Sequence, residues 1–302
     1  NRGIELAVNY DILKSKDWDL SVGANWSSID NEILSLATAD EVQNSRPYQR
    51  RAGYSFYQYR LRDCLGIAQE DFKDAYGHTV KAGDNFFAEG SYYEKGDIAD
   101  QYIKFKDGTE VQKGEVVPQT GYNYAPTTRN YSSQFIIDGK TALPKGYGGF
   151  NFDLRWKDLS FSMAWSYKYG HYIFDNCTDD FFHDGYVTRY MNIAKGQVDC
   201  WTPENKDAKC IASNSQSGNY YDSDNFLFKG DFLRLKNATV SYNLPKAFTK
   251  KANITNARVY VAGANLLTFS GLHVDPEIQQ SGYYSMGMPS MRTVTFGVEV
   301  SF

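Results

Sequence analysis

The final segment of the chain alternates between apolar and polar side chains. One face carries the apolar residues Val294, Phe296, Val298, Val300 and Phe302, and the other carries Thr293, Thr295, Gly297, Glu299 and Ser301. A strand with one apolar and one polar face is typical of a membrane-spanning β-barrel, and a soluble β-sandwich uses the same period of two. The period alone therefore leaves both architectures open.

Six further segments show the same alternation, which makes seven expected strands. The first two form a hairpin around Ser15–Asp17, and the next two form a hairpin around Lys157–Asp158. On a soluble protein, the apolar face of the second hairpin would be a large exposed patch, whereas lipid would cover it. The seven segments are 3–13, 18–27, 150–157, 159–170, 230–244, 257–269 and 290–302.

Short turns alternate with long irregular intervals along the chain. In bacterial barrels, short turns face the periplasm and long loops face outside. Within the first long interval, Arg51–Arg62 is the best strand candidate. The expected organisation is a hairpin at 3–36, a long extracellular loop region at 37–146, a hairpin at 147–170, an extracellular loop at 171–228 and the last three strands at 229–302.

Composition favours the barrel. The 302 residues include 24 Tyr and 19 Phe, although the mean hydropathy is −0.54. Aromatic girdles combined with half-polar strands produce this mixture in outer-membrane barrels. The absence of a long apolar run excludes a transmembrane helix but not a barrel, whose signal is dispersed over short segments. The net charge of −4 and the absence of a Lys/Arg cluster argue against nucleic acid as a partner.

The four cysteines, Cys64, Cys177, Cys200 and Cys210, form no CxxC pair. Cys200 and Cys210 bracket a short segment and could form a disulfide in an oxidising compartment, or they could stay thiols; the sequence leaves both open. No signal peptide is visible, and Asn1–Glu5 resembles the middle of a strand. We therefore expect the chain to be the C-terminal part of a longer polypeptide.

Several motifs resemble those of SusC/RagA-like TonB-dependent transporters of the Bacteroidetes. The longest are Asp231–Pro245 and Arg258–Phe269, and together the motifs cover both ends of the chain and most of the expected strands. The others, in the order of the family, are Asn1–Leu6, Leu143–Lys145, Gly148–Phe150, Trp201–Asn205, Asp275–Glu277 and Arg292–Gly297.

This resemblance implies an all-β fold, the C-terminal part of a large 22-stranded barrel. The plug domain and the signal peptide are expected to be absent from this chain. The family imports oligosaccharides or peptides across the bacterial outer membrane, with energy from the TonB complex and a SusD-like surface lipoprotein as a lid. Whether two transporter–lid pairs form a dimer is a question that the sequence does not decide. Residues 96–108 depart from the family, because their acids are too sparse for a calcium loop.

Loop aromatics and acids are the substrate-binding candidates, since aromatic rings can stack on sugars and carboxylates can accept sugar hydroxyls. The alternatives are that the aromatics support the loops or contact the lid, and that the acids form a solvated loop face. Charges on the polar faces of the strands, such as Asp153, Arg155 and Glu299, are expected to pair with neighbouring strands or the plug. The candidates are Tyr54, Tyr57, Tyr59, Asp179, Asp180, Trp201, Tyr220 and Tyr221.

We expect no catalysis, no cofactor and no metal site. The four histidines lack the spacing of zinc ligands, and no GxSxG, HExxH or P-loop sequence is present. The terminal Phe302 resembles the C-terminal signal by which outer-membrane barrels are recognised for assembly, and it is also a candidate girdle aromatic.

Two other function classes compete with import. A secreted or surface all-β carbohydrate-binding module would share the alternation and the aromatic loops, but it would bury the apolar strand faces under a second sheet. A passive porin would need neither plug nor lid, and the motifs argue against it. The importer and the binding module differ in what covers the apolar face of residues 159–167, which is lipid in the importer and a second sheet in the binding module.

Overall fold

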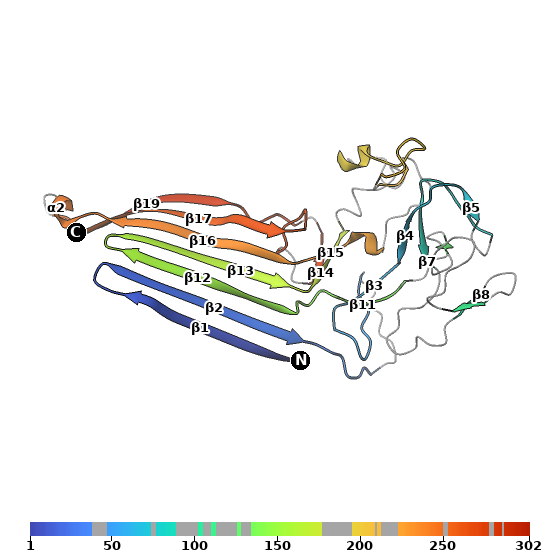
Figure 1. Ribbon diagram of the computed structural model, residues 1–302, viewed down its shortest axis with the longest axis horizontal. Coiled ribbons are helices and arrows are strands. Elements are labelled where there is room, and N and C mark those ends of the chain that lie inside the picture. The colour runs from blue at the N-terminus through green and yellow to red at the C-terminus, as the bar shows by residue number, and fades with distance from the viewer. Residues whose placement is uncertain are drawn as a thin grey trace.

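Seven long antiparallel strands form one sheet, and shorter strands and loops gather at one end of it (Figure 1). Each long strand pairs with the next long strand along the chain, as in an up-and-down barrel wall. The computed structural model describes residues 1–37, 47–73, 77–88, 102–104, 110–112, 126–127, 134–176, 195–208, 210–212, 223–249, 253–277, 281–285 and 287–302. The strands of the sheet are β1 (Arg2–Lys14), β2 (Trp18–Asp30), β12 (Gly146–Trp156), β13 (Leu159–Tyr169), β16 (Phe232–Asn243), β17 (Asn256–Ser270) and β19 (Thr293–Ser301).

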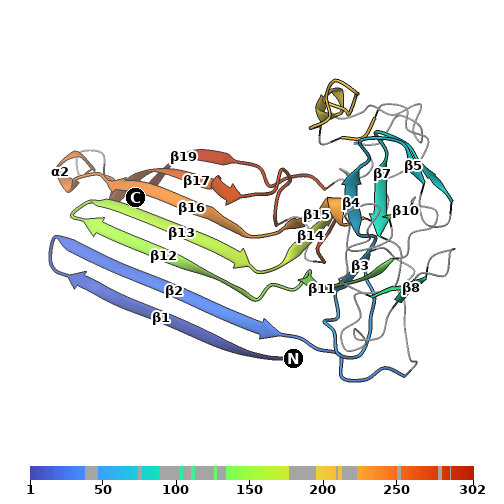
Figure 2. The ribbon, with the colours of Figure 1, turned by 45° about the vertical axis from the view of Figure 1, so that its right-hand side comes forward.

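These seven strands are the seven that the alternation predicts, each within a few residues. Consecutive strands meet at what we call the turn end, through residues 15–17, 157–158 and 244–255. The connection 244–255 carries the one-turn helix α2 (Lys246–Thr249). At the opposite end, which we call the loop end, the described parts of the long connections 31–145, 170–231 and 271–292 come together (Figure 1). Figure 2 agrees with Figure 1 that α2 and the C-terminus lie far from these loops.

Backbone hydrogen bonds join neighbouring turns at the turn end. The amide of Lys157, at positive φ (53°), donates to the Asp17 carbonyl at 2.7 Å. The Asn243 amide donates to the Asp158 carbonyl at 2.9 Å. The sheet pairing therefore continues beyond the ends of the strands.

A β-bulge at Lys236 shifts the alternation of β16. Ala164 of β13 faces Asn237, but Trp165 faces Leu235, so Lys236 has no partner on β13. An uninterrupted strand would place Arg234 on the apolar face together with Val240 and Tyr242. The bulge exchanges the faces beyond it, so that Leu235 joins the apolar face and Arg234 the polar one.

The hydrophobic core lies in the loop end and not beneath the sheet. Its largest cluster comprises Tyr48, Tyr59, Leu61, Ile137, Ala142, Phe174, Ile211, Phe226 and Leu227. A smaller cluster joins Ala68, Val80 and Phe86. The elements that supply these residues are short, and most of them pair across large sequence separations. No helix among the described residues is long and apolar enough to cross a membrane.

The short elements of the loop end begin with β3, which occupies only the end of the segment Arg51–Arg62 expected to be a strand. Gly53 has φ = 85° and forms a turn, which stops the extended backbone from starting earlier. The elements are β3 (Gln58–Leu61), β4 (Cys64–Ile67), β5 (Phe72–Lys73), β6 (Thr79–Val80), β7 (Asn85–Ala88), β8 (Tyr102–Lys104), β9 (Glu110–Gln112), β10 (Pro126–Thr127), β11 (Phe135–Thr141), β14 (Tyr172–Asp175), η2 (Lys195–Val198), η3 (Asp224–Phe226), β15 (Leu227–Lys229) and β18 (Tyr283–Tyr284).

Candidate functional site

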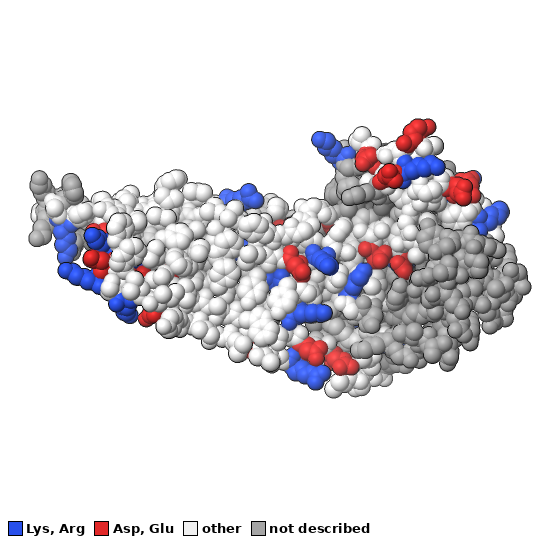
Figure 3. All heavy atoms as spheres, viewed as in Figure 1, with Lys and Arg blue, Asp and Glu red and all other residues white. Residues whose placement is uncertain are grey.

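One face of the sheet is apolar and exposed. Phe296 is 77% exposed, Val298 68% and Val8 65%. The register keeps these side chains on one side, since Phe296 faces Val261 on β17 and Val8 faces Ala24 on β2. In the view of Figure 3, charged side chains gather toward the two ends of the sheet and leave a broad uncharged band between them. A continuous apolar surface of this kind marks contact with lipid or with another protein.

Aromatic side chains stack on this apolar face. At the turn end, Trp18 stacks on Trp156 with ring centroids 5.6 Å apart. Toward the loop end, Trp165 stacks on Phe150 at 5.8 Å and on Phe269 at 6.4 Å. These stacks lie at the turn end and near the middle of the strands, and they add aromatic surface to the apolar face, as in the wall of a membrane-spanning barrel.

The opposite face of the sheet is polar and has a hollow in its middle. A side chain at Gly23 would place its Cβ 2.3 Å from Asn151 Oδ1 and 2.5 Å from Asn9 Oδ1. Small residues, including Gly149 and Ala164, extend this hollow, whose volume is about 240 Å³. Carboxamides both donate and accept hydrogen bonds. The hollow can therefore hold a hydroxylated or amide-bearing chain, and it offers no nucleophile.

Two of the expected charge pairs are present across neighbouring strands, while Asp153 accepts a hydrogen bond from Asn151 of its own strand. Arg155 Nη2 lies 3.7 Å from Asp19 Oδ2, and Arg258 Nη1 lies 3.6 Å from Glu299 Oε2. Both pairs are partly exposed, so each contributes only about 0–1 kcal/mol. They balance charge on the polar face without closing it.

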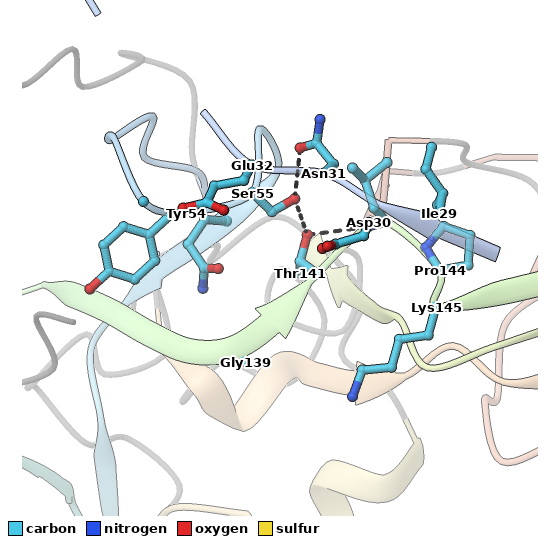
Figure 4. Close-up of a pocket in the computed structure, with 13 residues that line it drawn as sticks. Ile29, Asp30, Asn31, Glu32, Tyr54, Ser55, Gly139, Thr141, Pro144 and Lys145 are labelled. Atoms are coloured by element: carbon cyan, nitrogen blue, oxygen red, sulfur yellow. Dashed lines mark hydrogen bonds between the residues drawn. The ribbon is translucent and has the colours of Figure 1, made fainter. Parts of the chain in front are cut away.

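A second pocket, of about 260 Å³, lies where β2 and β12 reach the loop end. Figure 4 shows polar side chains converging there from β2, β11 and the loop around Ser55. Asn31 Oδ1 accepts hydrogen bonds from Ser55 Oγ at 3.2 Å and from the Phe56 amide at 2.7 Å. Thr141 Oγ1 donates to Ser55 Oγ at 3.0 Å. Together with the carboxylate of Glu32, these groups suit a ligand rich in hydroxyl or amide groups.

The Arg234 side chain, placed on the polar face by the bulge, holds the β17–β19 loop. Arg234 Nη2 lies 2.5 Å from Asp275 Oδ1, and Arg234 Nη1 lies 2.6 Å from Glu277 Oε2. Burial raises the pKa of Asp275, but hydrogen bonds from Arg234 and from the Glu277 and Ser290 amides outweigh burial and lower it to about 2. The side chains of Arg234 and Asp275 are 3% and 5% exposed. This is therefore a buried ion pair.

The same loop also contacts the aromatic core. The Gly282 carbonyl accepts hydrogen bonds from the Phe174 amide at 2.7 Å and from the Tyr59 hydroxyl at 2.7 Å. His273 Nε2 lies 2.6 Å from Asp175 Oδ2, whose side chain is fully buried. The hydrogen bond that His273 donates to Asp175 raises the pKa of His273 despite partial burial. The β17–β19 loop thus connects strand β16 of the sheet to the aromatic core.

Four of the predicted substrate-binding residues are buried in the loop end or pack against its core. Tyr59 is 0% exposed, Tyr54 4% and Trp201 7%, and Tyr57 packs against the main core. Trp201 Nε1 donates to Gln69 Oε1 at 3.0 Å. These contacts agree with the loop-supporting alternative for each side chain, and substrate contact by the four residues stays a prediction.

The remaining predicted candidates, Asp179, Asp180, Tyr220 and Tyr221, lie outside the described residues. Phe302 lies at the turn end and is 89% exposed. Sequence reasoning missed the carboxamide hollow around Gly23 and the pairing of Arg234 with Asp275. The β-bulge that places Arg234 on the polar face has no recognisable pattern in the sequence.

No group of three or more possible metal ligands occurs within the described parts of the chain. His171 is 4% exposed, and burial lowers its pKa to about 4. His171 is therefore neutral at physiological pH.

Comparison with known proteins gives relatives of one kind, although no family model matches the chain. TonB-dependent receptor P26 of Formosa agariphila is 30% identical over 316 residues, covering 100% of this chain and 29% of the relative. TonB-dependent receptor P3 of the same organism is 25% identical, with 28% of its length covered. TonB-dependent receptor SusC of Bacteroides thetaiotaomicron is 23% identical, with 26% covered. The chain thus spans less than a third of the curated relatives it matches.

Among solved structures, the RagAB peptide transporter aligns with a TM-score of 0.74 at 22% identity, covering 99% of this chain and 29% of that one. Its "open-open" and "closed-closed" states align with TM-scores of 0.71 and 0.70. These relatives are named as receptors and transporters, and none as an enzyme. The resemblance inferred from the motifs is confirmed: the chain corresponds to the C-terminal portion of the β-barrel of SusC/RagA-like TonB-dependent transporters.

Proposed function

We propose that this chain works as part of an importer that carries oligosaccharides or peptides across the bacterial outer membrane. Transport draws its energy from the inner membrane through the TonB complex, because the outer membrane has no ATP supply of its own. A SusD-like lipoprotein closes the loop end. The protein acts as a carrier and performs no bond chemistry.

The two-faced sheet is the observation that carries this proposal. Its apolar face, with Phe296 and Val298 mostly exposed, suits lipid, and its polar face suits a water-filled or plugged interior. The loops at one end alone, opposite the short turns (Figure 1), suit a barrel whose outer mouth selects the substrate. The names of the relatives support TonB dependence.

Oligosaccharides are the first substrate class and peptides the second. The carboxamides around Gly23 and the hydroxyls around Ser55 suit either class, since both offer donors and acceptors in quantity. The aromatic and mildly acidic loops favour sugars. Among the described candidates, Tyr57 keeps the most accessible position, being packed at the edge of the core.

A genetic experiment tests import. Strains lacking the full-length transporter gene, the gene for its lid lipoprotein, or TonB receive a defined mixture of oligosaccharides and peptides. Mass spectrometry then follows the depletion of each compound from the medium. We expect all three strains to lose uptake of the same compounds, and the restored transporter gene to recover it. The proposal would be refuted if the strain that lacks the transporter gene depleted every compound from the medium as fast as the wild-type strain does.

Heat modifiability separates the importer from the carbohydrate-binding module. A folded barrel extracted from the outer membrane runs faster on an SDS gel without boiling than after boiling. The binding module would be soluble without detergent and unchanged by boiling.

A further inference from the structure

Cys200 and Cys210 lie side by side in the loop end, in a geometry that fits a covalent link. They are partners in a parallel β-bridge, and the Trp201 amide donates to the Cys210 carbonyl at 2.9 Å. Neighbouring strands lie about 4.8 Å apart, which falls inside the range of about 4.4–6.8 Å between the Cα atoms of a disulfide. Bridge partners also project their side chains to the same side.

The described backbone between the two cysteines, residues 201–208, forms hydrogen bonds without a covalent link. The Asn205 amide donates to the Thr202 carbonyl at 2.9 Å, and Asn205 Nδ2 donates to Asp199 Oδ1 at 2.7 Å. These bonds order the segment that follows Cys200, and the parallel bridge sets the two cysteines, which are free thiols in this structure, on adjacent strands. Engineered disulfides often fail because they distort such native geometry.

The segment between the cysteines packs against a neighbouring turn. A side chain at Gly83 would place its Cβ 2.6 Å from Trp201 Cε3 and 2.5 Å from Ala212 Cβ. The Ala212 amide donates to the Gly83 carbonyl at 2.8 Å. The turn therefore contacts one residue between the two cysteines, Trp201, and one just after them, Ala212, and a link between the cysteines would hold both contacts in register.

We propose that Cys200 and Cys210 form a disulfide in the exported protein, closing a loop that holds Trp201 over the turn at Gly83. The inference rests on the proposed function, because export brings the chain to a compartment outside the inner membrane. The oxidant there is a thiol oxidase protein that carries a disulfide. The partly exposed Cys200 thiolate attacks the oxidant disulfide and forms a mixed disulfide. The Cys210 thiolate then displaces the oxidant, and two electrons and two protons leave as the oxidant dithiol.

Cys64 serves as an internal control. Burial is the main cause that raises its pKa, to about 12, and Asn225 Nδ2 donates to its sulfur at 3.0 Å. Cys64 also pairs with Phe87 of β7 and not with another cysteine. Cys64 therefore stays reduced in the same protein.

Peptide mapping of the full-length protein from the outer-membrane fraction tests the disulfide. Thiols are trapped with N-ethylmaleimide in denaturant, and trypsin is added without reductant. Cleavage after lysine separates the two cysteines onto Gly196–Lys206 and Cys210–Lys229. We expect these peptides as one linked species that a reductant separates, and maleimide on Cys64 in Asp63–Lys73.

Two results would overturn the disulfide: maleimide on both cysteines, or a link from either of them to Cys177, in protein that fractionates with the outer membrane. Both leave the proposed function standing. A protein that is soluble without detergent counts against the proposed function instead.

A second measurement uses the exposed Lys206. After limited native trypsin cleavage there, the wild-type fragments should stay joined on a non-reducing gel. They should separate in Cys200→Ser and stay joined in the matched control Cys64→Ser. Wild-type fragments that separate without reductant would contradict the disulfide.

Discussion

Arg234 is 3% exposed and carries a full charge at any physiological pH, so its surroundings have to supply the opposite charge. Asp275 and Glu277 do so, both from the β17–β19 loop. Removing one member of such a buried group leaves the other charges desolvated, which costs more than the pair contributes. The partly exposed neighbour Lys236 also contacts Glu277, at 2.9 Å, and offers a matched comparison.

Arg234→Met should therefore lower the free energy of unfolding by about 3–5 kcal/mol, whereas Lys236→Met, at a partly exposed pair, should lower it by about 0–1 kcal/mol. Urea unfolding of the full-length protein in lipid vesicles measures both values. Equal losses in the two variants would show that burial of Arg234 carries no special cost.

His273 should make the loop contact pH-dependent. Its pKa is raised in the folded protein by Asp175. Proton binding therefore favours the folded contact: the stabilisation is complete below the ordinary histidine pKa of about 6.5 and is lost as pH rises through the raised value. Protease protection of residues 271–292, measured from about pH 5 to about pH 8, should fall with rising pH in the wild type and stay flat in His273→Gln. Parallel curves would exclude His273 as the cause.

At the residue scale, the role of a single aromatic residue in a loop could not be predicted from the sequence. Tyr59 and Trp201 were predicted either to bind substrate or to support the loops, and the sequence could not choose. Their burial depends on distant segments: the Tyr59 hydroxyl bonds to Gly282, and Trp201 meets Gly83. Contacts over such separations leave no local pattern.

At the scale of elements, the period of two predicted all seven long strands, because each has one apolar and one polar face. It failed at irregularities. The bulge at Lys236 breaks the alternation, so a strict reading would put Arg234 on the apolar face. The turn at Gly53 shortened the strand expected at 51–62 to Gln58–Leu61.

Neighbouring positions on β19 test which face meets lipid. Phe296→Arg should cost about 2–4 kcal/mol if the side chain lies near the middle of the bilayer, and it should reduce the heat-modifiable form in the outer membrane. Thr295→Arg places the same charge on the polar face and should leave assembly close to wild type. The amount of heat-modifiable protein per cell measures both variants. A larger loss from Thr295→Arg would invert the assignment of the two faces.

For the whole molecule, the sequence predicted the sheet and its connectivity, because consecutive strands pair and the short turns fall at one end. It could not predict the loop end. There, β11 pairs with β3 and β14 pairs in parallel with β18, which is more than a hundred residues away. Loops that pair with distant loops carry little local periodicity, and only the folded chain brings their polar groups together.

The β17–β19 loop contacts three separate parts of the chain. Arg234 holds it to β16, Asp175 and Phe174 hold it to β14, and Tyr59 bonds to it from β3. A small displacement cannot release one of these contacts and keep the others, because they are only a few residues apart on the same loop. Opening at this place would therefore be cooperative and all-or-none, with a barrier set by the three contacts together and not by the weakest of them.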